Sequence, residues 1–282
     1  MKPKSPKTFK PKLLLLGFSL AFLLLLLLFL LTAGRSSSPP PLTASAAAAQ
    51  TPACTKLPPS LAKTIVHYTT SNITPQQTLR EISVTAKVLE RKSPCNFLVF
   101  GLGYDSPMWS ALNHGGRTVF LEEDESWIGS MTRKFPELEA YHVKYDTRVS
   151  QADELLELRR SSSCTTAAAA AADTRSSGCR LALTELPDVF YGVEWDLIMV
   201  DAPTGYVAKA PGRMSAIYTA GLAARGRSEG DTDVFVHDVD RAVEDRFSKA
   251  FLCEGYMKEE VGRLRHFTIP SHRANPSFSF CP

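Results

Sequence analysis

The stretch from Cys95 to Asp124, CNFLVFGLGYDSPMWSALNHGGRTVFLEED, decides the fold class. Its first apolar run, Phe97 to Phe100, breaks on Gly101-Leu102-Gly103, and its second, Thr118 to Leu121, leads into an acidic cluster. Glycine allows a sharp turn and a close approach of the backbone to a ligand. Two short apolar runs separated by a glycine turn and a helical stretch indicate parallel strands joined by a crossover helix.

The same alternation continues towards the C-terminus. Further strands are predicted at Tyr141 to Tyr145, Trp195 to Val200 and Asp233 to Val236. The chain then ends differently, because Tyr256 to Val261 and Arg263 to Ile269 meet at Gly262 and read as a hairpin. A hairpin added to a parallel sheet forms an antiparallel edge. We therefore expect an α/β fold with a mostly parallel sheet and a C-terminal antiparallel hairpin.

Two helices are predicted beside this sheet. Thr74, followed by Pro75 and Gln77, resembles an N-cap and capping box, and apolar residues then recur at helical spacing to about Lys92. A second helix is expected from Ser126 to Phe135, with the acids before it favouring its first turn.

The N-terminus has the pattern of a membrane anchor. Residues 13–33 are 21 almost wholly apolar residues, and five lysines but no acids precede them. About 20 such residues cross a bilayer, and the positive charge keeps residues 1–12 in the cytosol. The alternative is a cleaved signal peptide. Residues 34–56 are rich in Ser, Pro and Ala and are predicted to be a flexible stalk, which leaves residues 57–282 as a luminal domain.

The charge of the chain argues against a nucleic-acid partner. Residues 1–35 hold six basic and no acidic side chains, so the formal net charge of +3 for the chain leaves −3 for the remainder. A nucleic-acid-binding domain would need a basic face.

The cysteines predict disulfides in a luminal compartment. The chain has six cysteines, which allow 15 full pairings. Cys164 and Cys179 flank an alanine-rich insert, RRSSSCTTAAAAAADTRSSGCR, that is predicted to be a surface loop. They either form a disulfide that joins its ends or remain two unpaired thiols.

The ends of the first two strands suggest a nucleoside site. In open parallel sheets, ligands bind at the carboxyl ends of the strands. Gly101 and Gly103 turn there, and Glu122 follows Gly103 by 19 residues, a separation at which an acid accepts hydrogen bonds from ribose hydroxyls. Asp105, at the start of the next helix, would repel the pyrophosphate of a dinucleotide. The sulfonium nucleoside S-adenosylmethionine fits this acidic site better than NAD.

Three more polar residues follow later strands. Asp201 ends the run WDLIMVD, and His237 and Asp238 end VFVHD. Together they would supply a general base, or bind one divalent cation through Asp201 and Asp238. The alternative is that His237 is a hydrogen-bonded structural residue. Asp201 also lies close enough in the predicted sheet to contact the cofactor.

Several segments carry a resemblance to a known family. The segments CNFLVFGLGYDSPMW, LNHGGRTVFLEED, WDLIMVDAPTGY, APGRMSAIYTAG, TDVFVHDV and GRLRHFTIPSHR closely resemble plant glucuronoxylan 4-O-methyltransferases, a family long named for a domain of unknown function. The resemblance covers nearly all of Leu57 to Arg273. It implies a Rossmann-like methyltransferase fold and S-adenosylmethionine-dependent methylation of O4 on the glucuronic acid branches of xylan.

The resemblance also implies residue roles and a location. Gly101, Gly103 and Glu122 would bind the cofactor, and Asp201 with His237-Asp238 would face the reacting hydroxyl. The protein would be a single-pass type II protein of the Golgi membrane, acting in secondary cell wall synthesis with other xylan-synthesising proteins. A divalent metal is a further possibility that the family suggests. Two alternatives stay open: a non-catalytic xylan-biosynthesis scaffold, and a methyltransferase for small phenolic acceptors.

The acceptor would carry a carboxylate, which calls for a cation. Arginine suits this best, because its planar guanidinium pairs with a carboxylate through two hydrogen bonds. Arg213, in the loop after Asp201, is the first candidate, and Arg241, Arg265 and His266 follow.

Overall fold

The computed structural model describes residues 57–170 and 173–282 of the chain. The predicted tail, membrane span and stalk, residues 1–56, lie outside the described residues, as do Cys54 and two residues of the alanine-rich insert. Within the described ranges, no helix combines the length and the apolar character needed to cross a bilayer.

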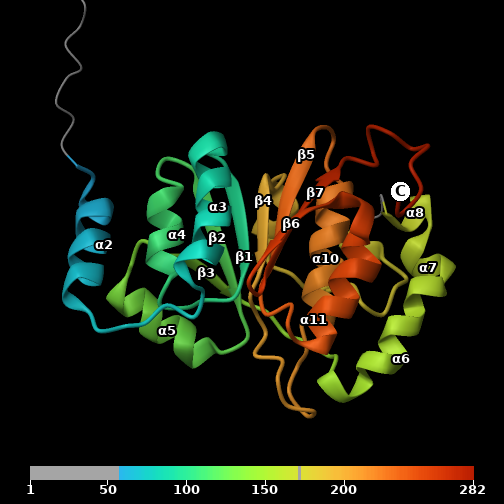
Figure 1. Ribbon diagram of the computed structural model, residues 1–282, viewed down its shortest axis with the longest axis horizontal. Helices are drawn as coiled ribbons and strands as arrows, with labels where there is room; N and C mark the ends of the chain where they lie inside the picture. Colours follow the sequence, from blue (N-terminus) through green and yellow to red (C-terminus); the bar gives the residue numbers. More distant parts are fainter. Residues whose placement is uncertain (1–56, 171–172) are drawn as a thin grey trace, which may run out of the picture. The chain divides into compact units, whose positions relative to one another are not determined.

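A seven-stranded mixed sheet organises the described residues, in the order β3-β2-β1-β4-β5-β7-β6 (Figure 1). The strands are β1 Asn96–Phe100, β2 Arg117–Glu122, β3 Glu139–His142, β4 Leu197–Val200, β5 Asp231–Val236, β6 Met257–Val261 and β7 Leu264–Pro270. Strands β1 to β5 pair in parallel, and β7 pairs antiparallel with both β5 and β6. The order β3-β2-β1-β4-β5 is Rossmann-like. The predicted α/β class and the terminal antiparallel hairpin are confirmed.

Helices cover both faces of the sheet. They are α2 Pro59–Thr70, α3 Leu79–Lys92, α4 Ser106–Leu112, α5 Glu125–Lys134, α6 Ala152–Leu156, α7 Ser162–Thr165, α8 Ala167–Ala170, α9 Asp188–Gly192, α10 Met214–Arg225 and α11 Ala242–Phe247. Figure 1 shows α3, α4 and α5 on one side and α10 and α11 on the other.

Alternate residues of each strand fill two separate cores, because successive side chains of a strand point to opposite faces. Leu98 and Phe100 pack with the buried residues of α10, whereas Phe97 and Val99 pack with α3, α4 and α5. Burial on both faces explains why the strands read as continuous apolar runs.

Helix α3 starts later than the sequence predicted. Its N-cap is Thr78, whose hydroxyl accepts from the N–H of Glu81, while the Glu81 carboxylate accepts from the N–H of Thr78 at 2.6 Å. The predicted N-cap, Thr74, is therefore wrong by four residues, since the acid that completes the capping box is Glu81. The predicted end at Lys92 is confirmed.

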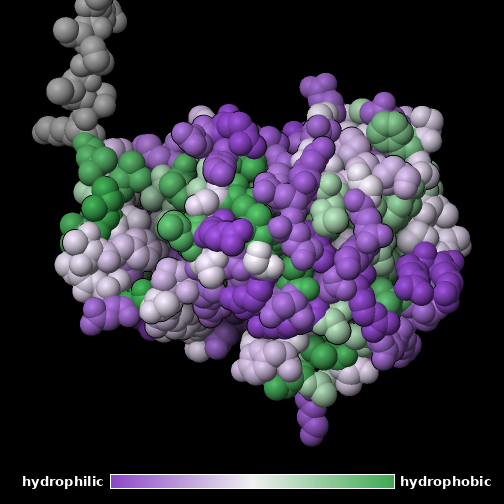
Figure 2. All heavy atoms as spheres, in the orientation of Figure 1, coloured by the Kyte–Doolittle hydropathy of each residue, from purple (hydrophilic) through white to green (hydrophobic). Residues whose placement is uncertain are grey.

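Helix α2, which the sequence analysis did not predict, lies against α4. Leu57, Ile65 and Val66 on and next to this helix are exposed, and Figure 2 shows hydrophobic atoms gathered over it. One residue of this helix, Tyr68, reaches the pocket described below, and its hydroxyl donates to the carbonyl of Tyr104.

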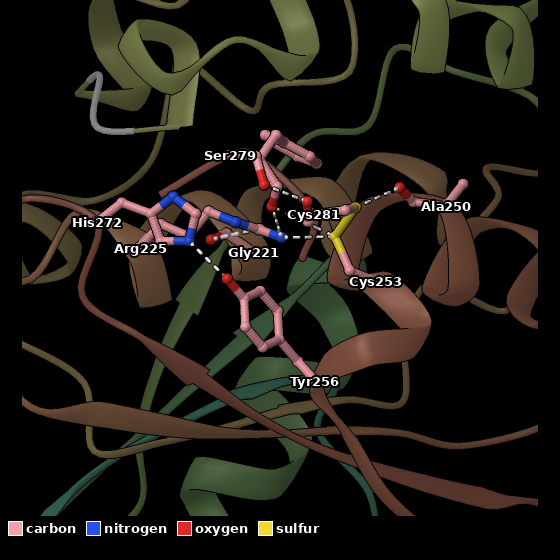
Figure 3. Close-up of a disulfide and its surroundings, with 9 residues drawn as sticks. Gly221, Arg225, Ala250, Cys253, Tyr256, His272, Ser279 and Cys281 are labelled. Atoms are coloured by element: carbon pink, nitrogen blue, oxygen red, sulfur yellow. Dashed lines mark hydrogen bonds between the residues drawn. A yellow bond between two sulfur atoms is a disulfide. The ribbon is translucent and has the colours of Figure 1, made fainter. Parts of the chain in front are cut away.

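Two disulfides cross-link segments of the C-terminal half. Cys164 and Cys179 are bonded, with Cα atoms 4.9 Å apart, so the disulfide alternative for the insert is correct. The insert is not a plain loop, because its serine and alanine residues form the short helices α7 and α8. Cys253 and Cys281 form the second disulfide, beside the buried Arg225 (Figure 3). Among the described cysteines, Cys95 is free.

Candidate active site

A pocket of about 840 Å³ opens at the carboxyl ends of β1, β2, β4 and β5. Its walls come from the loops that follow these strands, from the segment before α3, and from Arg263 in the β6–β7 turn. This is the edge at which open parallel sheets bind ligands.

The loop after β1 depends on its two glycines. Gly101 has φ +125°, a conformation that favours glycine, and its N–H donates to the carbonyl of Leu121 at 2.7 Å. A Cβ on Gly103 would lie 2.6 Å from an oxygen of Asp105. Both residues line the pocket, so the backbone itself forms part of its wall.

Glu122 ties the end of β2 to this loop. Its carboxylate accepts hydrogen bonds from the N–H groups of Leu102 at 3.0 Å, Glu123 at 2.9 Å and Asp124 at 3.1 Å. Burial raises its pKa, and the three backbone hydrogen bonds counteract this only in part. Asp124 caps α5 by accepting from Ser126 and Trp127. Glu122 thus both lines the pocket and fixes the shape of the end formed by β1 and β2.

Asp105 faces the same end of the pocket. It occupies the N-cap position of α4 but makes no capping hydrogen bond, and instead accepts from the indole N–H of Trp109 at 2.8 Å. Burial and then the charge of Asp201 raise the pKa of Asp105 to about 6. Tyr104 and Trp127, whose rings meet edge to face at 5.2 Å, form an aromatic wall nearby.

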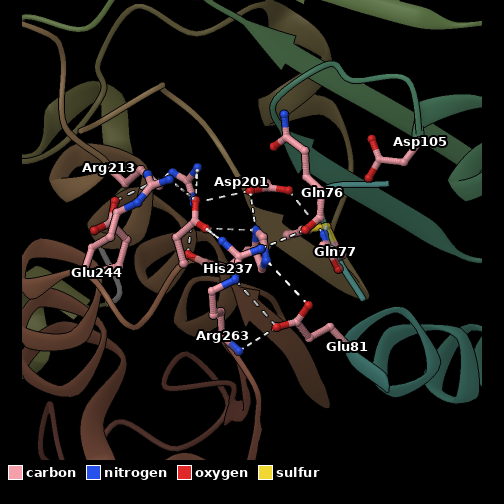
Figure 4. Close-up of polar contacts among 12 residues, drawn as sticks. Gln76, Gln77, Glu81, Asp105, Asp201, Arg213, His237, Glu244 and Arg263 are labelled. Atoms are coloured by element: carbon pink, nitrogen blue, oxygen red, sulfur yellow. Dashed lines mark hydrogen bonds and ion pairs between the residues drawn. The ribbon is translucent and has the colours of Figure 1, made fainter. Parts of the chain in front are cut away.

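Asp201 and His237 form a hydrogen-bonded pair at the centre of the site (Figure 4). The His237 Nδ1 to Asp201 Oδ1 distance is 2.9 Å. The sheet sets this contact, because Asp201 directly follows β4, His237 directly follows the neighbouring β5, and both backbone N–H groups still pair with the adjacent strand. Asp201 lines the pocket and His237 lies buried behind it.

Two residues of the α3 region complete this pair, and neither was among the site residues predicted from the sequence. Gln77 donates to the second oxygen of Asp201 at 3.2 Å, and Glu81 lies 3.9 Å from Nε2 of His237. Burial raises the pKa of Asp201, but the hydrogen bond from His237 and the charge of Arg213 outweigh it, so the pKa is below its ordinary value. Asp201 is therefore ionised at neutral pH.

Asp238 is surrounded by three arginines. Its carboxylate lies 2.9 Å from Arg213, 2.8 Å from Arg241 and 2.6 Å from Arg263. Its φ is +61°, which is uncommon for a non-glycine residue and directs the side chain into this cluster. Asp238 therefore acts as the anchor of an arginine cluster, defined here as Arg213, Arg241 and Arg263.

The arginines of this cluster differ in accessibility. The side chain of Arg213 is only 4% exposed and also contacts Asp201 at 3.3 Å and Glu244 at 3.8 Å. Arg241 and Arg263 are 32% and 37% exposed. All three line the pocket, but Arg213 is a buried counter-ion, whereas the other two are partly exposed there. Arg263 was missed because the hairpin sequence marks only a strand at this position, and only the folded sheet brings it beside Asp238.

Arg265 and His266 lie elsewhere. Arg265 is buried on β7, where it pairs with Asp245 and Glu260 at 2.8 and 2.6 Å. His266 bonds to Asp233 at 2.7 Å. Neither lines the pocket, so the folded structure does not bring them together with the other predicted site residues.

The residues named as possible metal ligands do not fit a divalent cation. One ligand atom each of Asp201, His237 and Asp238 lie within 4.8 Å of one another. The Asp238 carboxylate, however, already faces the three guanidinium groups, and Asp201 faces Arg213 and His237. A cation bound there would sit among positive charges, which Coulomb repulsion disfavours.

Comparison with known proteins shows the family of this chain. The family model described as IRX15/IRX15L/GXM matches residues 80–267. Glucuronoxylan 4-O-methyltransferase 3 of Arabidopsis thaliana is 64% identical over 232 residues, covering 82% of this chain and 77% of the relative. Glucuronoxylan 4-O-methyltransferase 1 is 57% identical with full coverage of both chains, and arabinogalactan O-methyltransferase 2 is 51% identical over 76% and 74%, both from the same plant.

Solved structures resemble the chain only weakly. An O-methyltransferase from Bacillus cereus is 15% identical, with a TM-score of 0.39 over 76% of this chain and 91% of that one. The family model spans most of the described residues and several relatives are more than half identical. The chain therefore belongs to the IRX15/IRX15L/GXM family.

Proposed function

We propose that this protein is a glucuronoxylan 4-O-methyltransferase, which transfers the methyl group of S-adenosylmethionine to O4 of glucuronic acid side chains. One observation carries the proposal: a single pocket has an acidic, glycine-turned end and an arginine end, and the Asp201–His237 pair lies between them. The names of two relatives that are more than half identical support the same reaction.

The acidic end suits the cofactor. S-adenosylmethionine supplies a methyl group on a sulfonium cation when bound, and Asp105 and Glu122 provide negative charge for it. The backbone at Gly101 and Gly103 admits the nucleoside closely, and the aromatic wall of Tyr104 and Trp127 offers a surface for its base.

Asp201 serves as the general base. When the acceptor hydroxyl takes the methyl group that bound S-adenosylmethionine would supply, Asp201 would accept the hydroxyl proton. A carboxylate only accepts hydrogen bonds, so His237 must carry its proton on Nδ1 and donate it to Asp201. Gln77 donates to the other oxygen, so the two donors hold the carboxylate in one orientation. A low pKa suffices for this base, because the sulfonium is a good leaving group.

The setting of the reaction is also part of the proposal. The lysine-rich N-terminus and the apolar segment 13–33 support a type II protein anchored in the Golgi membrane, with the catalytic domain in the lumen. The two disulfides are typical of an oxidising compartment. Glucuronoxylan would be the acceptor there, with other xylan-synthesising proteins as partners.

The two alternatives have less support. A scaffold protein would not need the aligned pair of Asp201 and His237 inside a pocket. A phenolic acceptor would favour apolar walls, whereas the acceptor side of this pocket carries Arg241 and Arg263.

The deciding experiment uses methyl-labelled S-adenosylmethionine and glucuronoxylan oligosaccharides. The wild-type protein should place the label on O4 of glucuronic acid. Asp201→Asn should lower kcat by about 10²- to 10⁴-fold, the range for loss of a general base, and should still bind the cofactor in calorimetry. Label on another atom, or cofactor binding with no transfer to any acceptor, would contradict the proposal.

A further inference from the structure

The charged side chains that line the pocket are unevenly distributed between its two ends. The end formed by β1 and β2 is lined by acids and, among the described residues, by no basic residue: Asp105, Glu122, Glu123 and Asp124. The end formed by β4, β5 and the β6–β7 turn holds the three arginines of the cluster together with Asp201 and Asp238. An acceptor with its own negative charge would be attracted to the second end and repelled from the first.

We infer that Arg241 and Arg263 together form the recognition site for the carboxylate of the acceptor sugar. This inference rests on the proposed function and assigns the acceptor carboxylate to a pair of residues. It replaces the expectation from the sequence that Arg213 makes this contact, and it adds Arg263, which the sequence did not single out.

Arg213 is already fully engaged. It donates to the carbonyls of Pro203 at 3.0 Å and His237 at 2.9 Å, and it pairs with Asp238 at 2.9 Å. Its side chain is only 4% exposed. A ligand would have to displace these buried contacts, and breaking a buried ion pair is costly.

Arg241 and Arg263 are held in place but keep donors for a ligand. Arg241 donates to the carbonyl of Thr204 at 3.1 Å and pairs with Asp238 at 2.8 Å. Arg263 donates to Asp238 at 2.6 Å and to the carbonyl of Gln76 at 2.8 Å. A guanidinium has five N–H donors in a planar fork. Each arginine therefore keeps N–H groups that these contacts do not use and that can bind a ligand in the pocket.

Asp238 separates the two arginines. Arg263 pairs with its Oδ1 and Arg241 with its Oδ2, so one carboxylate fixes both guanidinium groups. They come from distant parts of the chain, one from the loop before α11 and one from the β6–β7 turn. Asp238 is therefore a positioning residue, and the two arginines are the ligand contacts.

The chemistry of glucuronic acid matches this arrangement. Its carboxyl group is attached to C5, next to the C4 that bears the accepting hydroxyl, so the carboxylate must bind close to the base. Ligand atoms of Asp201 and Asp238 lie within 4.8 Å of one another. When the O4 hydroxyl meets Asp201, the carboxylate faces the arginines that Asp238 holds. This contact would align the hydroxyl as well as select the sugar.

The test measures binding of two acceptors by calorimetry. One is a glucuronoxylan oligosaccharide, and the other is the same molecule with its carboxyl reduced to an alcohol, which keeps O4. Wild-type protein should bind the acidic oligosaccharide at least tenfold more tightly. Arg263→Gln and Arg241→Gln should each remove most of this preference, with affinity for the reduced oligosaccharide within twofold of wild type. Arg91→Gln, at the exposed end of α3, is the matched control.

Cofactor affinity and thermal melting report whether each variant is folded, and two separate variants keep the test decisive if one is unstable. The inference is overturned if both folded variants keep the wild-type preference, if they lose affinity equally for both oligosaccharides, or if wild type shows no preference. Because binding is read without turnover, a protein that prefers the acid but transfers no methyl group contradicts the proposed function and not this site.

Discussion

The environment of Asp105 predicts a pH dependence of cofactor binding. Its pKa of about 6 means that it loses its charge as pH falls through this value. The neutral carboxyl attracts a sulfonium less, so we expect the dissociation constant of S-adenosylmethionine to rise between pH 7 and pH 5. Calorimetry across this range should show a flatter profile for Asp105→Asn.

The same shift has the opposite sign for stability. The folded state holds the Asp105 proton more tightly than the unfolded state, so its contribution to the unfolding free energy falls as pH rises from about 4 to about 6. The control for both the binding and the stability measurements is Asp188→Asn, a change at a fully exposed acid on α9. An Asp105→Asn variant that keeps the wild-type pH profile of cofactor binding would assign the effect to another group.

Glu122 tests the proposal that the nucleoside binds at the β1 and β2 end of the pocket. Glu122→Gln replaces one acceptor oxygen by an amide N–H group, which cannot accept from the backbone donors around it. The change also weakens the expected acceptance from the ribose hydroxyls. Hydrogen bonds to charged groups contribute about 1.5–3 kcal/mol each, so cofactor affinity should fall at least tenfold. Glu123→Gln is the comparison. If it alone weakens cofactor binding, the ribose contact belongs to Glu123.

At the scale of elements, the α3 capping box also serves the site. Glu81 caps the helix, accepts from the N–H of Arg263 at 2.6 Å and lies beside His237. Its pKa is held down, because the hydrogen bonds from Thr78 and Arg263 outweigh burial. The start of α3 is thus coupled to the β6–β7 turn that carries Arg263.

The alanine-rich insert is an element whose stability depends on its disulfide. The Cys164–Cys179 bond spans 15 residues, and closing a loop of that size stabilises a protein by about 3 kcal/mol in the chain-entropy model. We therefore expect the double change Cys164→Ala with Cys179→Ala to lower the unfolding free energy by about this amount in urea denaturation. Both cysteines are buried in the main core. The kcat should change little, since neither residue lines the pocket. Equal stability of the two proteins would contradict this role.

At the scale of the whole molecule, the proposed anchor predicts an orientation. Protease added to sealed Golgi vesicles should remove the lysine-rich tail and spare the residues after Arg35, because the charge before the span keeps only the tail outside. Detergent should then expose the domain to digestion. Loss of the domain in sealed vesicles would contradict the type II orientation.

Local patterns in the sequence were sufficient to predict most strands of the sheet, although β3 lies at Glu139–His142 and not at the predicted Tyr141 to Tyr145. The apolar runs of β1, β2, β4 and β5, the glycine turn after β1 and the terminal hairpin were all recognisable, because burial on both faces and tight turns constrain neighbouring residues directly. The positions of Asp201 and His237 also followed, since a residue just after a strand must lie at the edge of the sheet where ligands bind.

Tertiary structure alone decided which side chains meet and which are covered. Gln77 reaches Asp201 across 124 residues of sequence and Arg263 reaches Asp238 across 25. Arg213 and Arg265 look in the sequence like any other arginine, yet the fold buries them among carboxylates, while it leaves Arg241 and Arg263 partly exposed. The physical reason is that a charged side chain's partners and its exposure depend on the distant segments packed around it, and no local pattern encodes those segments.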